Sequence, residues 1–253
     1  MRFTSEQHLD DDTVLEREFT LGEIPGILWT PACACAPAPL ILLGHPTMGL
    51  QKMYPRLLAR ARSAVADGYA AATIELPGSG VRPRCAAMDL ARADLQRALR
   101  EGRPVTDDIV DRLVLPLVDQ AVPEWQVALD ALLTLPEIGG PVGYSGGVIA
   151  IGTRLGVVEP RISAAVLFAG SFVPRASFEE ARQVTIPLHV LLQWDDEGND
   201  RQMALDLFDA FGSADKSLHA NMGGHTGVPL HAAEEANRFF ARHLRAITPS
   251  SPR

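Results

Sequence analysis

The stretch that decides the fold covers residues 141–150 and reads Pro-Val-Gly-Tyr-Ser-Gly-Gly-Val-Ile-Ala. Residues 143–147 fit the pattern G-x-S-x-G, in which a strand turns sharply into a helix and a serine stands at the apex of the turn. Such a serine is expected to have a strained backbone, for which the flanking glycines leave room. Helix breakers come before this stretch and an apolar run follows it, so strand, turn and helix arrive in the required order. The pattern favours Ser145 as a nucleophile over a serine placed by chance in a glycine-rich turn.

Length and composition indicate one globular domain covering residues 1–253. No Pro/Ser-rich linker or change of composition divides the 253 residues. Hydrophobic residues make up 47% of the chain and charged residues 21%, which is ordinary for a protein with a large core. The net charge is -8 and there is no long basic run, which argues against nucleic acids and anionic membranes as partners.

The ends of the chain and its cysteines predict a cytoplasmic protein. The start of the chain lacks the apolar core of a signal peptide, and no apolar run reaches transmembrane length. Three cysteines are too few for a disulfide framework and fit a reducing compartment. Cys33 and Cys35 lie in a Pro/Ala loop without a matching His/Cys pair, so we expect no metal site there.

Hydrophobic periodicity predicts strands that alternate with helices. Strands are expected at residues 14–20, 24–30, 40–43, 69–75, 142–144, 164–169, 187–192 and 217–220, the first two as an antiparallel hairpin. Helices are expected at residues 55–66, 123–135, after Ser145, at 201–211 and at 229–245, with a looser stretch through Phe172 and Pro174 and a frayed tail at 248–253. This alternation is typical of an α/β fold with a mainly parallel twisted sheet and helices on both faces.

Residues 81–122 form a short helical insert before the serine. Two apolar stripes at helical spacing lie within it, and Pro116 is expected to kink or end the second helix. Pro123 is then expected in the first turn of the next helix. The insert is a candidate lid over a site, and an ordinary packed helical crossover remains the alternative.

A serine nucleophile needs a base and a group that orients the base. His225 lies in the glycine-flanked loop after the last predicted strand, from which its ring can reach the strand ends, so it is the candidate base. Asp195 and Asp196 directly follow a buried strand. Neighbouring side chains in an extended segment point in different directions, so we expect only one of these carboxylates to face the imidazole. The order along the chain is Ser, Asp, His.

These features resemble the α/β-hydrolase superfamily over residues 14–245. The resemblance rests on the elbow at Ser145, a Gly-His-Pro turn at residues 44–46, the Asp195–Asp196 pair and the Gly-Gly-His loop. Within the superfamily, the chain is most similar to dienelactone-hydrolase-like proteins and small carboxylesterases. Dienelactone hydrolases use a cysteine nucleophile, whereas this chain has serine.

The resemblance implies further site residues. The oxyanion hole would be formed by the backbone N–H groups of Gly146 and Thr47, and His45 would shape the loop through side-chain hydrogen bonds. The family's acid commonly stands three residues after a turn glycine. Gln193 takes that glycine's place here, which favours Asp196.

The predicted function is therefore a serine esterase that forms an acyl-enzyme on Ser145, with Asp196 and His225 completing the triad. Lactones, thioesters or carbon–carbon bonds would be cleaved with the same parts, and no cofactor or metal is needed. The partner is a small-molecule ester, and the chain is expected as a monomer or homodimer. A hydrolase-fold protein without catalysis, acting in binding or regulation, is the alternative. Residues in or near loops at one end of the sheet could line an acyl pocket: Met48, Tyr54, Tyr144, Phe172, Trp194 and Met222.

Overall fold

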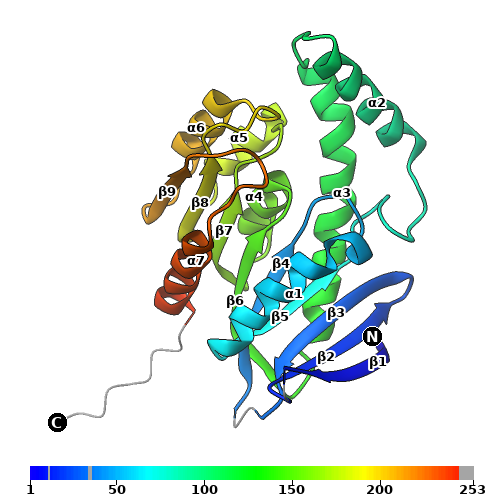
Figure 1. Cartoon of the computed structure of the whole chain (residues 1–253), viewed down its shortest axis with the longest axis vertical. Coiled ribbons are helices and arrows are strands. Elements are labelled where there is room, and N and C mark those ends of the chain that lie inside the picture. Colours follow the sequence, from blue (N-terminus) through cyan, green and yellow to red (C-terminus); the bar gives the residue numbers. More distant parts are fainter. Residues whose placement is uncertain (11, 34–35, 245–253) are drawn as a thin grey trace, which may run out of the picture.

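The computed structural model describes residues 1–10, 12–33 and 36–244. Cys35 and the predicted tail at 248–253 lie outside these residues. Within the described chain, nine strands form one sheet in the order β1-β2-β3-β5-β4-β6-β7-β8-β9 (Figure 1). The strands are β1 (Arg2–Leu9), β2 (Val14–Leu21), β3 (Ile24–Pro31), β4 (Ala38–Gly44), β5 (Ala70–Ile74), β6 (Ile138–Gly146), β7 (Ile162–Phe168), β8 (Leu188–Gln193) and β9 (Lys216–Asn221).

The sheet is antiparallel at one side and parallel elsewhere. β1, β2 and β3 form an antiparallel meander that joins β5, and every pair from β5 through β4 to β9 is parallel. The carboxyl ends of the parallel strands therefore meet at one edge, where ligands bind in open α/β sheets. The predicted hairpin of residues 14–30 and the mainly parallel sheet are confirmed.

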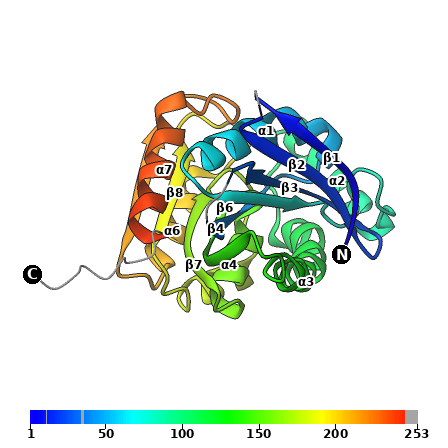
Figure 2. The same cartoon turned by 90° about the horizontal axis from the view of Figure 1, so that it is seen from below.

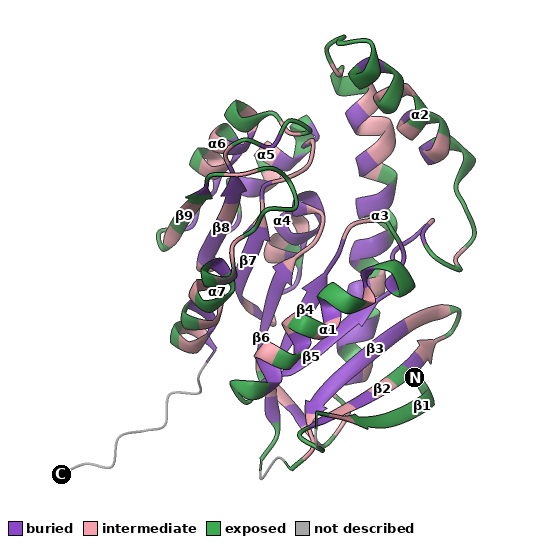
Figure 3. Ribbon diagram, viewed as in Figure 1, coloured by how far each residue is buried: buried purple, intermediate pink, exposed green. Residues whose placement is uncertain are grey.

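Helices cover both faces of the sheet (Figure 2). The helices are α1 (Leu50–Ala66), α2 (Ala86–Arg100), α3 (Asp107–Leu132), α4 (Ile149–Val158), α5 (Arg175–Ala181), α6 (Arg201–Ala210) and α7 (Leu230–His243). One core cluster lies under α1 and α7, and the other lies under α2 to α6. The central strands are buried along their whole width, whereas the outer faces of the helices are exposed (Figure 3). Continuous apolar runs such as residues 40–43 are the sequence signal of such doubly covered strands.

Pro116 was predicted to kink or end a helix, and it does not end one; the prediction that Pro123 begins another helix is wrong. α3 runs without interruption from Asp107 to Leu132 and contains both prolines. A proline inside a helix costs about 3 kcal/mol or more. Ten buried residues along α3, including Trp125, offset that cost through apolar contacts.

The insert at residues 81–122 is consequently not a separable unit. α2 packs along the N-terminal part of α3, and the two helices project beyond the sheet (Figure 1). α3 then continues past residue 122 into the core. Movement of this pair as a lid stays a prediction.

Two elements were not predicted. β1 is exposed at nearly every position, so it lacks the alternating apolar pattern that marks a half-buried strand. α5 has only seven residues, and the sequence around Phe172 and Pro174 indicated an irregular stretch. Edge strands and short helices depend on neighbours that local patterning does not reveal.

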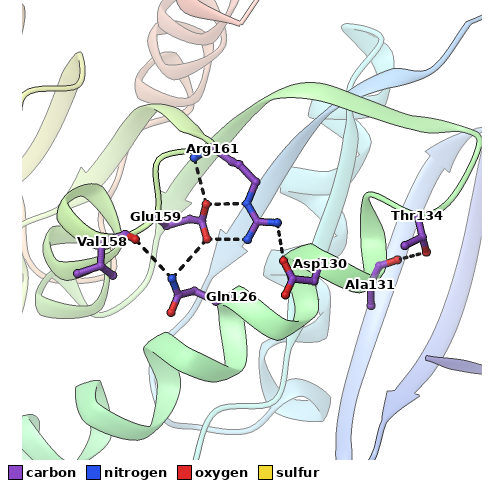
Figure 4. Close-up of polar contacts among 7 residues, drawn as sticks. All are labelled: Gln126, Asp130, Ala131, Thr134, Val158, Glu159 and Arg161. Atoms are coloured by element: carbon purple, nitrogen blue, oxygen red, sulfur yellow. Dashed lines mark hydrogen bonds and ion pairs between the residues drawn. The ribbon is translucent and has the colours of Figure 1, made fainter.

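A polar network joins α3 to the segment between α4 and β7 (Figure 4). Arg161 donates to both oxygens of the Glu159 carboxylate at 2.7 Å and to Asp130 at 2.5 Å. Gln126 of α3 reaches the carbonyl of Val158 at 3.4 Å. Glu159 is only 3% exposed, and the hydrogen bonds from Arg161 hold its pKa below the ordinary value of 4.5.

We predict that Glu159→Gln lowers the free energy of unfolding by about 1–2 kcal/mol at pH 7, because two charge-assisted hydrogen bonds are weakened. A lowered folded pKa stabilises the protein above the unfolded pKa, and this contribution disappears as the pH falls through the folded value. In denaturant unfolding, the difference between wild type and variant should therefore shrink as the pH falls from the ordinary value of 4.5 through the lowered folded pKa of Glu159. Glu101→Gln, at an exposed ion pair, is the control and should change little. A gap that persists unchanged at acid pH would contradict the prediction.

Candidate active site

The turn between β6 and α4 carries the predicted elbow. β6 ends at Gly146 and α4 begins at Ile149, so strand, turn and helix follow in the predicted order. Gly146 has φ 74° and Gly147 has φ 77°, whereas the non-glycine residues with positive φ in the described chain are Asp10 and Asp12. The expectation of a strained Ser145 backbone is therefore wrong, and the positive φ angles of this turn fall on the two glycines, which adopt them without strain.

Ser145 is a strand residue in this structure. It pairs with Leu43 of β4 and Val166 of β7, and it is 9% exposed. The apex of the turn is formed by Gly147 and Val148, which carry no nucleophilic group. A signal for this register is present in the sequence, because two successive glycines are poor starts for a helix and favour a helix that begins after them.

Arg60 of α1 holds the Ser145 end of the strand. Its Nη1 donates to the carbonyl of Gly44 at 2.8 Å, and its Nη2 donates to the carbonyl of Ser145 at 2.5 Å and to Ser145 Oγ at 3.0 Å. Burial of the guanidinium lowers the pKa of Arg60 to about 10. Arg60 was not among the residues predicted from the sequence. Its position in α1 beside the buried Leu57, Ala61 and Ala64 was the available signal, since a cation beside an apolar stripe needs polar partners.

Asp196 and His225 are brought together at the ends of β8 and β9. His225 Nδ1 lies 2.7 Å from Asp196 Oδ2, and Asp196 Oδ1 accepts from the Gly198 amide at 3.1 Å. A carboxylate only accepts, so Nδ1 carries the hydrogen and Nε2 is left as the basic nitrogen. The Asp196 side chain is 3% exposed, while that of His225 is 53% exposed. This is an oriented imidazole that is open to a reactant.

Asp196, and not Asp195, faces the imidazole. The Asp195 amide instead donates to the Gly223 carbonyl at 3.1 Å, while the Asp195 side chain is exposed. Asn199 ties the same acid loop to the end of β7 through a 2.7 Å bond to the Ala169 carbonyl.

Within the described residues, no hydrogen bond joins Ser145 to His225. The His225 ring lies edge-on to Phe168 at a centroid distance of 5.5 Å, and Phe168 is two residues beyond Val166, the β7 partner of Ser145. Strands rise about 3.3 Å per residue, so Ser145 stands about 7 Å below the level of Phe168 along the sheet. Ser145 Oγ is directed to Arg60 instead.

The predicted oxyanion loop lies between β4 and α1. The His45 ring is buried and bonds the carbonyls of Pro46 and Ile74 at 2.8 and 2.9 Å, which is the loop-shaping arrangement expected for it. A 2.7 Å bond from the Met48 amide to the Pro46 carbonyl closes a tight turn around Thr47. Gly146, the other predicted donor, is paired with Gly44 in the ladder.

Glu75 fixes the far end of this loop. Its buried carboxylate accepts from the Leu50 amide at 3.0 Å and from the Ser79 hydroxyl at 2.6 Å. A carboxylate at the first turn of α1 suits the positive end of the helix dipole. This cap was not predicted from the sequence, because Glu75 lies 25 residues away from Leu50 along the chain.

A cavity of about 640 Å³ opens beside the histidine. Its lining consists of Gly170, Asp195, Asp196, Glu197, Gly198, Gly224 and His225. The predicted pocket residues Met48, Phe172 and Trp194 are not in this lining, and Arg201 covers the Trp194 ring at 4.4 Å. Tyr144 as a pocket residue is wrong, because it is 1% exposed and packs edge-on against Trp125 in the core.

The described residues contain neither a metal-binding cluster nor a membrane-spanning helix. No group of three or more His, Cys, Asp or Glu side chains in this part of the chain is placed to hold a metal ion. None of the helices described is both long and apolar enough to cross a membrane.

Solved structures with the same architecture are numerous. A cold-adapted esterase from an Arctic intertidal metagenomic library is 26% identical, with 97% of this chain and 100% of that chain covered and a TM-score of 0.76. The chain has the α/β-hydrolase fold. A Klebsiella pneumoniae protein assigned as a dienelactone hydrolase is 15% identical over 90% of this chain and 97% of its own, with a TM-score of 0.66.

An acetyl xylan esterase from Paenibacillus sp. R4 has the same fold at 14% identity and a TM-score of 0.64, with 94% of this chain and 88% of that one covered. Comparisons with protein-family models and with curated proteins find no match. The solved structures therefore show the α/β-hydrolase fold of this chain.

The elbow geometry predicts an unequal effect of alanine at two glycines. A Cβ on Gly147 would lie 2.9 Å from the backbone of Gly44 and His45, whereas a Cβ on Gly68 meets nothing within 4 Å. Both glycines have positive φ, 77° and 86°, so each alanine carries a strain of about 1–2 kcal/mol. Gly147→Ala should cost at least about 2 kcal/mol more than Gly68→Ala in denaturant unfolding, because backbone atoms must move apart. Equal losses would show that the turn does not press on β4.

Proposed function

We propose that this protein is a carboxylic-ester hydrolase. The observation that carries the proposal is the Asp196–His225 pair, which stands at the carboxyl edge of the parallel sheet and opens into a cavity. The esterase that is 26% identical supports the same reaction class, since the alignment spans 97% of this chain. The substrate is then a small-molecule ester.

The proton-transfer step follows from the orientation of the imidazole. His225 Nε2 takes a proton from the attacking oxygen, and the Asp196 carboxylate stabilises the imidazolium that forms. The amides of Thr47 and Gly146 are the proposed donors to the tetrahedral oxyanion. Lactones and thioesters pass through the same kind of intermediate, so they belong to the same proposal.

In this proposal Ser145 is the attacking group and forms the acyl-enzyme, which water then hydrolyses. For this step the hydrogen bond between Arg60 and the Ser145 hydroxyl must break, and the hydroxyl must move towards His225 along the sheet. Gly146 and Gly147 are the residues able to allow this, because glycine accepts the required backbone changes at least steric cost.

A second candidate is favoured by the observed position of Ser145. Its bond to Arg60 and its place inside β6 are those of a structural residue. The chain would then be a hydrolase-fold protein without a serine nucleophile, in which His225 activates water directly or the cavity serves for binding or regulation.

We predict that a fluorophosphonate probe labels the wild type and that labelling is lost in Ser145→Ala. Hydrolysis of p-nitrophenyl acetate by this variant should fall about 10⁴-fold, because the acyl-enzyme can no longer form. Thermal unfolding checks that the variant folds without its bond from Arg60.

Two results would favour the second candidate. Absence of labelling, with turnover kept in Ser145→Ala and lost in His225→Ala, would indicate direct water activation. No turnover of any ester by folded wild type would indicate a binding protein.

The two neighbouring acids should behave differently. Asp196→Asn is expected to lower kcat by about 10³–10⁴-fold, because the imidazole loses its orienting carboxylate. Asp195→Asn leaves the hydrogen bond between Asp196 and His225 in place and should change kcat less than about threefold. Steady-state kinetics with p-nitrophenyl acetate, together with thermal unfolding, measures both. A large loss confined to Asp195→Asn would refute the assignment of the acid.

A further inference from the structure

The side chain of Gln193 is buried beneath the loop that carries His225. Gln193 is the last residue of β8 and is 1% exposed. Burying an amide in a protein interior costs about 1–3 kcal/mol unless its hydrogen bonds are replaced. Its Oε1 is buried without a hydrogen-bond partner among the described residues, so the side chain is only partly satisfied.

Among the described residues, the Gln193 side chain forms its hydrogen bond with Gly224, the residue before His225. Gln193 Nε2 donates to the Gly224 carbonyl at 3.0 Å. Gly224 also accepts from the Gly227 amide at 2.9 Å, which closes the turn that contains His225. A Cβ on Gly223 or on Gly227 would lie 3.6 Å from Gln193 Nε2, so both ends of the turn come close to this amide.

Among the described residues, the backbone hydrogen bonds from the end of β8 to this loop reach as far as Gly223. The Trp194 amide donates to the Asn221 carbonyl at 2.7 Å and the Asp195 amide donates to Gly223 at 3.1 Å. After Gly223, the Gln193 side chain provides the next bond from β8 to the loop. Gly223 has φ 138° and the loop is rich in glycine, so its own backbone resists displacement weakly.

We propose that Gln193 is a positioning residue for the reaction, acting through Gly224 to fix the direction of the His225 ring. The inference rests on the proposed function of His225 as base. It also explains why glutamine stands where the hydrolase pattern has a turn glycine: a glycine there would leave the Gly224 carbonyl without this donor. A misdirected imidazole lowers the rate because proton transfer requires alignment within a few tenths of an ångström.

The first test compares two replacements of similar length. Gln193→Met keeps the volume and removes the donor, and we expect kcat to fall about 10–100-fold with KM changed less than about threefold. Gln193→Glu places a carboxylate oxygen against the Gly224 carbonyl in place of a donor. Its kcat at neutral pH should therefore fall at least as far as that of Gln193→Met. Wild-type kcat in either variant would overturn the proposal.

Two controls separate positioning from stability. Gln202→Met changes an exposed glutamine of α6 and should keep wild-type kcat. Glu159→Gln is destabilised at a network distant from the cavity lining, and its kcat below the unfolding temperature should also be that of wild type. If Glu159→Gln lost as much kcat as Gln193→Met, the effect of Gln193 would be one of general stability.

A second readout does not need activity. The hydrogen that His225 Nδ1 donates to Asp196 should give a low-field proton NMR signal that is absent in His225→Ala. In Gln193→Met this signal should shift or broaden, whereas in Gln202→Met it should be unchanged. An unchanged signal in Gln193→Met would refute the positioning role even if no ester were hydrolysed. If the signal changed but the protein had no esterase activity, the positioning role of Gln193 would stand and only the proposed function would be rejected.

Discussion

The guanidinium of Arg60 lies where the ends of β4 and β6 meet, and both site loops on that side begin from the residues it binds. It bonds the carbonyl of Gly44, from which the His45 loop starts, and the carbonyl of Ser145, from which the glycine turn starts. Arginine suits this position, because its planar group has several donors and is weakly hydrated for a cation. Among the described residues, its hydrogen-bond acceptors are the carbonyls of Gly44 and Ser145 and the Ser145 hydroxyl, so carbonyl and hydroxyl dipoles stabilise its charge. Loss of this side chain would leave two buried carbonyls without their donor.

The other half of the site is assembled by different means. The Asp196 and His225 loops follow neighbouring parallel strands, and backbone bonds between β8 and the segment after β9 bring them together. Side-chain amides complete the assembly, with Asn199 joining the acid loop to β7 and Gln193 joining β8 to the histidine loop. An imidazole oriented by a buried carboxylate is thus present independently of the serine.

These two halves stand at different heights on the sheet. Phe168, which contacts the imidazole, lies two residues further along β7 than the partner of Ser145. The glycine pair between Ser145 and α4 is therefore the segment on which the choice between serine catalysis and another use of the cavity depends. Gly147 also packs closely against the backbone of Gly44 and His45, so a conformational change in this turn would displace the His45 loop.

The sequence by itself determined the parallel sheet, the order of its elements, and the position of the aspartate pair and the histidine in loops that follow strands. Each of these has a local signal: doubly apolar runs for buried strands such as β4 and β8, carboxylates directly after a strand end for Asp196, and a glycine-flanked loop after the last strand for His225. The choice of Asp196 over Asp195 came from resemblance, and only the folded loop shows which carboxylate faces the ring. The register of β6, the continuity of α3 through two prolines and the partners of Arg60, Glu75 and Gln193 were decided by the tertiary structure. The physical reason is that these features depend on ladder pairing and on burial against residues distant in sequence, which outweigh local propensity and a five-residue motif.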